Sequence, residues 1–112
     1  MKRDDAALLD IAQATRLAIE FVKEMNEHQF EKDLKTQSAV LHQLMVLGEA
    51  VKRLSPEYRD AHKEIPWREI AGLRDKLIHA YDSIDINQVW RVLTTDLPAL
   101  CKQTNPLLPA TK

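Results

Sequence analysis

A regular seam of apolar residues in the middle of the chain constrains the fold most strongly. Apolar side chains recur there with steps of four, three, four and three residues, at Val40, Leu44, Leu47, Val51 and Leu54. This spacing places them on one face of an α-helix and suits that face to packing along another helix. Gly48 lies beside the seam, where a missing side chain would let a neighbouring backbone come close. The sequence therefore predicts a long helix ending near Leu54.

The same helical period predicts a first helix from Asp4 to about Met25. Its apolar positions are Leu8, Ile11, Ala12, Thr15, Ile19 and Val22. The polar residues 26–29 break this pattern. Residues 30–34 are expected to form a short turn before the long helix.

Two prolines divide the segment that follows the long helix. Ser55-Pro56 predicts a stop and a restart, because Ser can cap a helix and Pro suits its first turn. Pro66 opens another helical pattern, which continues through Arg74 toward Tyr81. The apolar positions of that pattern are Trp67, Ile70, Leu73, Leu77 and Ile78.

After a short loop, Asp85 is expected to cap a last helix, with Gln88 placed to complete a capping box. The apolar positions of this helix are Ile86, Val89, Leu93, Leu97 and Leu100. Pro98 should kink or end it. We expect one helical domain over residues 1–104 and a flexible tail over residues 105–112.

Composition supports an all-α protein built as an antiparallel bundle of four to five helices. Hydrophobic residues make up 45% of the chain and charged residues 29%, and there are only two glycines. A chain of 112 residues holds a single core and is small enough that an oligomer would help to stabilise it. Short connections between helices make the antiparallel arrangement the economical one.

Charge and cysteine content limit the compartment and the partners. With 16 Lys plus Arg against 17 Asp plus Glu, no global field draws the protein to nucleic acid or to a membrane. The single Cys101 cannot form an intramolecular disulfide. No secretory leader pattern begins the sequence, and its apolar runs fall far short of the roughly 20 residues that a bilayer needs. A cytoplasmic protein without a membrane segment is expected.

The cluster Arg74, His79 and Tyr81 is the most informative feature for function. It offers a permanent cation, a side chain that exchanges a proton near neutral pH, and a phenol. These groups suffice to cut or modify a phosphodiester without a metal. The other histidines are scattered and lack partnering cysteines, so we expect no metal site. Two glycines far apart argue against a P-loop or a glycine-rich dinucleotide loop, and we expect no cofactor.

Helix geometry indicates that one straight helix cannot focus the whole cluster. Five residues turn through about 500°, which leaves Arg74 and His79 about 140° apart around the axis. Either the helix ends near His79 or a second copy of the chain completes the site, and a two-fold dimer would place two clusters across one cleft. Asp75, four residues before His79, is placed to orient its imidazole.

Several of these residues also have simpler interpretations. Arg74 could form a salt bridge along its own helix, and His79 could be a partly buried residue at a helix end. Glu49 could face the cleft or serve only helix packing. Lys52 and Arg53 are expected to form a solvated face rather than an RNA contact. Tyr81 could be a core residue with its hydroxyl at the surface, and Trp67 and Trp90 are expected to anchor the core or a dimer.

The cluster and its surroundings resemble the HEPN superfamily and, within it, the HepT branch. The HEPN signature is an Arg, a polar residue, three further residues and a His, which Arg74-Asp75-Lys76-Leu77-Ile78-His79 matches. The HepT branch adds the Tyr two residues later, here Tyr81. The flanks are also similar: Leu47-Gly-Glu-Ala-Val-Lys-Arg-Leu54, Ile65-Pro-Trp67, Ile70-Ala-Gly-Leu-Arg74 and the start of the helix at Asp85 to Trp90. The similarity runs from about Arg3 to Leu100.

The resemblance implies a homodimeric helical bundle that acts as a metal-independent endoribonuclease toxin of a type VII toxin–antitoxin pair. Arg74 and His79 from both subunits would be catalytic and would line a shared cleft. It further implies a nucleotidyltransferase antitoxin, MntA, which transfers AMP to the motif tyrosine, here Tyr81. A different class of function stays open, namely a non-catalytic helical module that binds and regulates such a transferase.

Overall fold

The fold is α-helical throughout the part of the chain that the structure, a computed structural model, describes. This part comprises residues 2–79 and 84–109, without the side chains of residues 77–79, and it contains no strand. The helices are α1 (Arg3–Phe21), α2 (Glu27–Lys32), α3 (Leu34–Arg53), α4 (Pro56–Ala61), α5 (Trp67–His79), α6 (Ile86–Arg91) and α7 (Leu97–Thr104). A π-helical turn, η2 (Val92–Asp96), joins α6 to α7, and a 3-10 turn, η3 (Asn105–Leu107), follows α7. The predicted all-α fold is confirmed.

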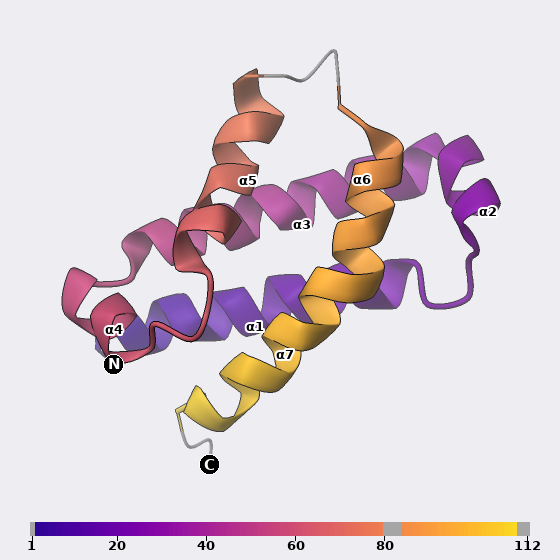
Figure 1. The fold of residues 1–112 in the computed structure, drawn as a ribbon. Coiled ribbons are helices and arrows are strands. Elements are labelled where there is room, and N and C mark those ends of the chain that lie inside the picture. The colour runs from indigo at the N-terminus through magenta and orange to yellow at the C-terminus, as the bar shows by residue number, and fades with distance from the viewer. Residues whose placement is uncertain (1, 80–83, 110–112) are drawn as a thin grey trace.

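Two layers of helices make up the bundle. Helices α1 and α3 form a long antiparallel pair, with α2 at the connection between them (Figure 1). Helix α5 packs across α3, and the continuous segment α6–η2–α7 crosses both members of the pair, with α7 packed on α1 (Figure 1). This arrangement sets α5, which carries the signature residues, directly on the long helix that the apolar seam predicted.

The core lies between the two layers and is formed mainly by α1 and α3. The five residues of the seam, four on α3 and the last at its C-terminal cap, are at most 1% exposed: Val40, Leu44, Leu47, Val51 and Leu54. Leu8 and Ile11 of α1 are buried equally well. Trp67 is buried and its indole N–H donates to the main-chain oxygen of His62, whereas Trp90 stacks at a tilt on the buried Phe30. Both tryptophans therefore anchor the core.

The segment between the two long helices differs from the prediction. Instead of a polar break followed by a turn at residues 30–34, the chain forms helix α2 from Glu27 to Lys32. Asn26 caps this helix through a complete capping box with Gln29, with bonds of 2.8 and 2.9 Å. The polar residues that interrupt the apolar pattern are the ones that start the helix. The side chain of Gln37 then donates to the oxygens of Phe30 and Glu31 and ties α2 to α3.

Three other boundaries test the predictions from proline and capping residues. Ser55 accepts a bond from the Tyr58 N–H and caps α4, as predicted. Asp85 accepts from the N–H groups of Asn87 and Gln88 and caps α6, but the bonds described there do not include the return bond from the Gln88 side chain that would complete the predicted capping box. Pro98 does not end the last helix, which continues to Thr104. The π-helical turn η2 precedes the proline, and within it the Leu97 N–H donates to the Val92 oxygen five residues back.

The chain beyond α7 keeps contact with the domain in its described part. Leu107 and Leu108 pack against the core as partly buried residues. The division into a domain of residues 1–104 and a flexible tail of residues 105–112 stays a prediction. A search of the described residues finds no helix with the length and apolar character that a membrane span requires.

Candidate functional site

The candidate site is built on the contact between α3 and α5. At this contact Gly48 of α3 faces the backbone of Arg74 of α5. A Cβ atom added to Gly48 would lie 3.2 Å from the Arg74 amide nitrogen and 3.3 Å from its Cα, and closer still to its Cβ. The prediction that Gly48 lets a neighbouring backbone come close is therefore confirmed. The two helices meet at the first residue of the signature.

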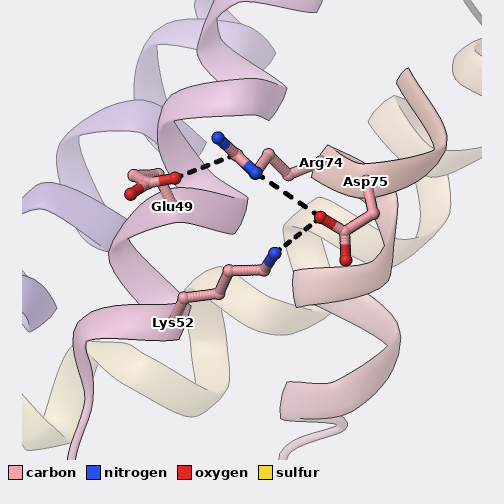
Figure 2. A network of polar contacts seen from close by, with 4 residues as sticks. All are labelled: Glu49, Lys52, Arg74 and Asp75. Carbon is pink, nitrogen blue, oxygen red and sulfur yellow. Dashed lines mark hydrogen bonds and ion pairs between the residues drawn. The ribbon is translucent and has the colours of Figure 1, made fainter. Parts of the chain in front are cut away.

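The guanidinium group of Arg74 lies between two carboxylates. Its Nε forms an ion pair with Oε2 of Glu49 at 2.8 Å, across the contact between the helices. Its Nη1 reaches Oδ1 of the neighbouring Asp75 at a longer 3.5 Å (Figure 2). The Arg74 side chain is 31% exposed, so its head group is held in place yet reachable from solvent.

Lys52 completes the network from the α3 side. Its Nζ donates to the same Oδ1 of Asp75 at 2.5 Å (Figure 2). The hydrogen bond from Lys52 is the main cause that lowers the pKa of Asp75 below its ordinary value, and the bond from Arg74 adds to it. Two cations and two carboxylates are thus joined in one chain of contacts that spans α3 and α5.

The predicted supporting residues both reach Arg74. Glu49 contacts Arg74 from another helix, so the pairing of Arg74 is not confined to its own helix. Asp75 was expected to orient His79, and its described contacts are with Lys52 and Arg74. The backbone of His79 forms the last residue of α5, so Arg74 and His79 share one helix, as the geometric argument assumed. The imidazole of His79 and all of Tyr81 lie outside the described residues.

Beside Arg74 runs a shallow surface groove that the sequence interpretation did not identify. It is lined by His42, Met45, Val46, Glu49, Arg53 and Arg74. The first five residues repeat at helical spacing along one outer stripe of α3, and Met45 is 37% exposed. That spacing is visible in the sequence, but the position of the stripe beside Arg74 depends on how α5 crosses α3.

The basic residues on the C-terminal part of α3 are exposed and paired with acids. Lys52 pairs with Asp75, and the Arg53 guanidinium pairs with Asp10 of α1. The main-chain oxygen of Arg53 also accepts a bond from Nε of Arg3. The expected solvated face therefore includes specific partners on α1 and α5.

Comparison with known proteins places the chain among ribonucleases. The family model described as "Ribonuclease HepT-like" matches residues 11–107. A protein of Thermococcus cleftensis named "Probable ribonuclease HepT" is 45% identical over 101 residues, which cover 89% of this chain and 92% of that protein. A protein of Caldanaerobacter subterraneus subsp. tengcongensis that is provisionally named an RNase is 38% identical over 112 residues, the full length of both chains.

A further relative, from Methanocaldococcus jannaschii, also carries a provisional RNase name. It is 37% identical over 108 residues, which cover 96% of this chain and 89% of that protein. No solved structure matches. The match of the family model over most of the chain, together with these relatives, shows that the chain belongs to the HepT-like ribonuclease family.

Proposed function

We propose that the protein is an endoribonuclease that works without a metal ion and acts as the toxin of a toxin–antitoxin pair. The observation that carries the proposal is the Arg74 guanidinium, which α3 and α5 hold in a fixed and solvent-accessible position within a chain of the HepT-like ribonuclease family. A bidentate cation of this kind matches the geometry of a phosphate group.

The chemistry follows from the groups that the signature supplies. His79 withdraws the proton from a ribose 2′-OH, and the resulting oxygen attacks the adjacent phosphorus. Arg74 grips the scissile phosphate and stabilises the charge that builds on its oxygens. The bond to the 5′ oxygen of the next nucleotide breaks, which leaves a 2′,3′-cyclic phosphate and a 5′-hydroxyl. DNA lacks the 2′-OH and should survive.

A homodimer completes the site in this proposal. Arg74 and His79 lie five positions apart on one helix. Five residues of an ideal helix turn through about 500°, which separates the two positions by about 140° around the axis, so a single copy is poorly suited to bring both to one phosphate. A two-fold dimer would set the Arg74 of one protomer opposite the His79 of its partner. RNA would then be bound in the cleft between the two copies.

Tyr81 is proposed as the point of regulation. A nucleotidyltransferase antitoxin of the MntA type would transfer AMP from ATP to the phenol oxygen, with pyrophosphate as the leaving group. The added phosphodiester places a negative charge near Arg74, where the substrate phosphate must bind. Modification would therefore silence the enzyme by repulsion and by bulk.

An RNA cleavage assay in chelator tests the proposed activity. Purified protein should cut RNA in excess EDTA and leave DNA of the same sequence intact. His79→Ala and Arg74→Ala should each abolish cleavage, while His28→Ala, which removes an exposed histidine from α2, should not. Loss of wild-type cleavage in EDTA would contradict the metal-independent mechanism.

The second function is a non-catalytic module that binds and regulates a transferase. The two carboxylates that contact Arg74 favour this function, because they compete with a phosphate for the guanidinium. This function would be supported if the protein bound the transferase tightly and left RNA uncut even at saturating protein concentration. Cleavage that His79→Ala removes would exclude it.

A further inference from the structure

Asp75 is shared unequally between the two cations of the network. Its Oδ1 lies 2.5 Å from Lys52 Nζ and 3.5 Å from Arg74 Nη1. The first distance is that of a short charge-assisted hydrogen bond, and the second is at the outer limit for one. Lys52, which reaches across from α3, therefore holds the Asp75 carboxylate more closely than Arg74 does (Figure 2).

This arrangement matters for the charge around Arg74. Without Lys52, one guanidinium would lie between the carboxylates of Glu49 and Asp75, and the three groups would carry a net charge of −1. Asp75 would also be released to move onto Arg74 and to occupy the terminal nitrogens. Both effects would oppose the binding of a phosphate, because like charges repel and the donors that a phosphate needs would be taken.

Stability alone does not account for the pair. The side chains of Lys52 and Asp75 are 38% and 49% exposed, and ion pairs at such exposure typically contribute little to the free energy of folding. The contact does have a geometric effect, since it turns the Asp75 carboxylate toward α3.

We propose that Lys52 is a positioning residue that restrains Asp75 and so keeps the terminal nitrogens of Arg74 available to an RNA phosphate. The inference rests on the proposed function to the extent that Arg74 binds that phosphate. Lys52 acts through Asp75 and touches no substrate in this proposal.

Binding of an RNA that cannot be cut separates this effect from catalysis. The probe is a mixed-sequence 2′-O-methyl RNA oligomer in EDTA, and the readout is its dissociation constant at fixed salt. Lys52→Ala should weaken binding about three- to tenfold, in the range of one hydrogen-bonded charge that is partly screened. The matched control is Lys35→Ala, which removes an exposed lysine from the first turns of the same helix. It should weaken binding less than twofold, by the general loss of one charge.

A second substitution distinguishes the two roles that Lys52 can have. In Lys52→Ala with Asp75→Asn the released carboxylate is gone, so binding should return to within about twofold of the wild type. Lys52→Ala with Asp60→Asn, which neutralises an exposed carboxylate on α4, has the same net charge but keeps Asp75, and its RNA binding should stay weak. If the double variant with Asp75→Asn bound RNA as weakly as Lys52→Ala does, the proposal would be overturned, since Lys52 would then act directly on the RNA. The proposal would also be overturned if the double variant with Asp60→Asn recovered the same RNA affinity, since only the net charge would then matter.

A measurement without RNA tests the positioning itself. In Lys52→Ala the Asp75 carboxylate should move onto Arg74 and slow the rotation of its guanidinium, which nitrogen-15 NMR detects at the Arg74 side chain. Unchanged guanidinium rotation would overturn the proposal. Wild-type protein that fails to cut RNA in EDTA contradicts the proposed function instead. Normal wild-type cleavage with Lys52→Ala binding equal to Lys35→Ala contradicts only the role of Lys52.

Discussion

Gly48 of α3 packs directly against the backbone of Arg74 of α5. A Cβ atom at position 48 would approach the Arg74 amide nitrogen to 3.2 Å, which is tighter than nine in ten contacts of real Cβ atoms. Glu49, the next residue on α3, pairs with the Arg74 guanidinium. One short segment of α3 thus fixes both the backbone and the head group of the arginine that begins the signature.

Gly48→Ala should therefore separate α3 from α5 and displace Arg74. Overpacking of this kind typically costs about 1–3 kcal/mol in the free energy of unfolding. RNA cleavage should fall as well, because the guanidinium leaves its position. Urea unfolding and a cleavage assay at a temperature where the variant is folded measure the two effects.

Gly72→Ala provides the matched control on α5. A Cβ atom there meets nothing within 4 Å, so the methyl group adds no clash. Replacing a helical glycine by alanine should stabilise the protein by up to about 1 kcal/mol and leave cleavage unchanged. If Gly48→Ala behaved in the same way, the close contact would have no role in holding the site.

The sequence predicted the contact at Gly48 but not the network around it. The apolar seam and the glycine beside it are local features, so their consequence could be derived from helix geometry alone. The pairing of Arg74 with Glu49 joins residues 25 positions apart and depends on the angle at which α5 crosses α3. Local periodicity contains no information on that angle.

Two features of the fold lie beyond what apolar periodicity and the position of a proline predict. Apolar periodicity does not reveal helix α2, because the capping box of Asn26 and Gln29 consists of polar residues that interrupt the apolar pattern. A proline lacks the N–H of the regular helix bond, which is why Pro98 is predicted to kink or end the last helix. The prediction of an end is wrong, and the prediction of a kink stays a prediction. The chain continues helically through a π turn, in which the Leu97 N–H reaches back to Val92.

Mixing two inactive variants should restore cleavage if the site is shared between protomers. Arg74→Ala and His79→Ala each lack one half of the pair. In a mixed dimer the intact Arg74 of one protomer faces the intact His79 of its partner, and cleavage that neither parent has should appear. The variants are mixed after mild denaturation and refolding so that subunits exchange. An inactive mixture that native mass spectrometry shows to contain mixed dimers would contradict a shared site.

AMP transfer should occur at Tyr81 and not at the other tyrosine of the chain, Tyr58. The pKa of the Tyr58 phenol is raised mainly by burial, and the nearby carboxylates of Asp4, Asp5 and Glu64 raise it further. Tyr58 is thus a poor nucleophile as well as a half-buried one. Incubation with the cognate transferase and ATP should add one AMP mass to the wild type and to Tyr58→Phe. An added mass on Tyr81→Phe would refute the assignment.

The contact between Asp4 and Ser55 should make stability depend on pH in the acid range. The Asp4 carboxylate accepts bonds of 2.8 Å from both the N–H and the hydroxyl of Ser55, and the backbone bond is the first cause that lowers its pKa. A group with a lowered folded pKa stabilises the protein above its unfolded pKa, near 3.8, and loses that contribution as the pH falls through the folded pKa.

Asp4→Asn should accordingly destabilise the protein most at neutral pH. The difference in the free energy of unfolding between wild type and variant should shrink as the pH falls below about 4. Urea unfolding at constant ionic strength from pH 7 to pH 3 measures it. A difference that stays constant over this range would mean that the charge of Asp4 plays no part.

The position of Gly48, Glu49 and Lys52 on one helix also has a consequence for recognising related genes. These residues form a Gly-Glu-x-x-Lys pattern that precedes the signature arginine by 22 to 26 positions, and all three act on Arg74 or on its neighbour Asp75. A genome screen that reads only Arg-x4-His leaves the three positions on α3 untested. Requiring both patterns at this separation would reject helical proteins in which the arginine and histidine co-occur by chance.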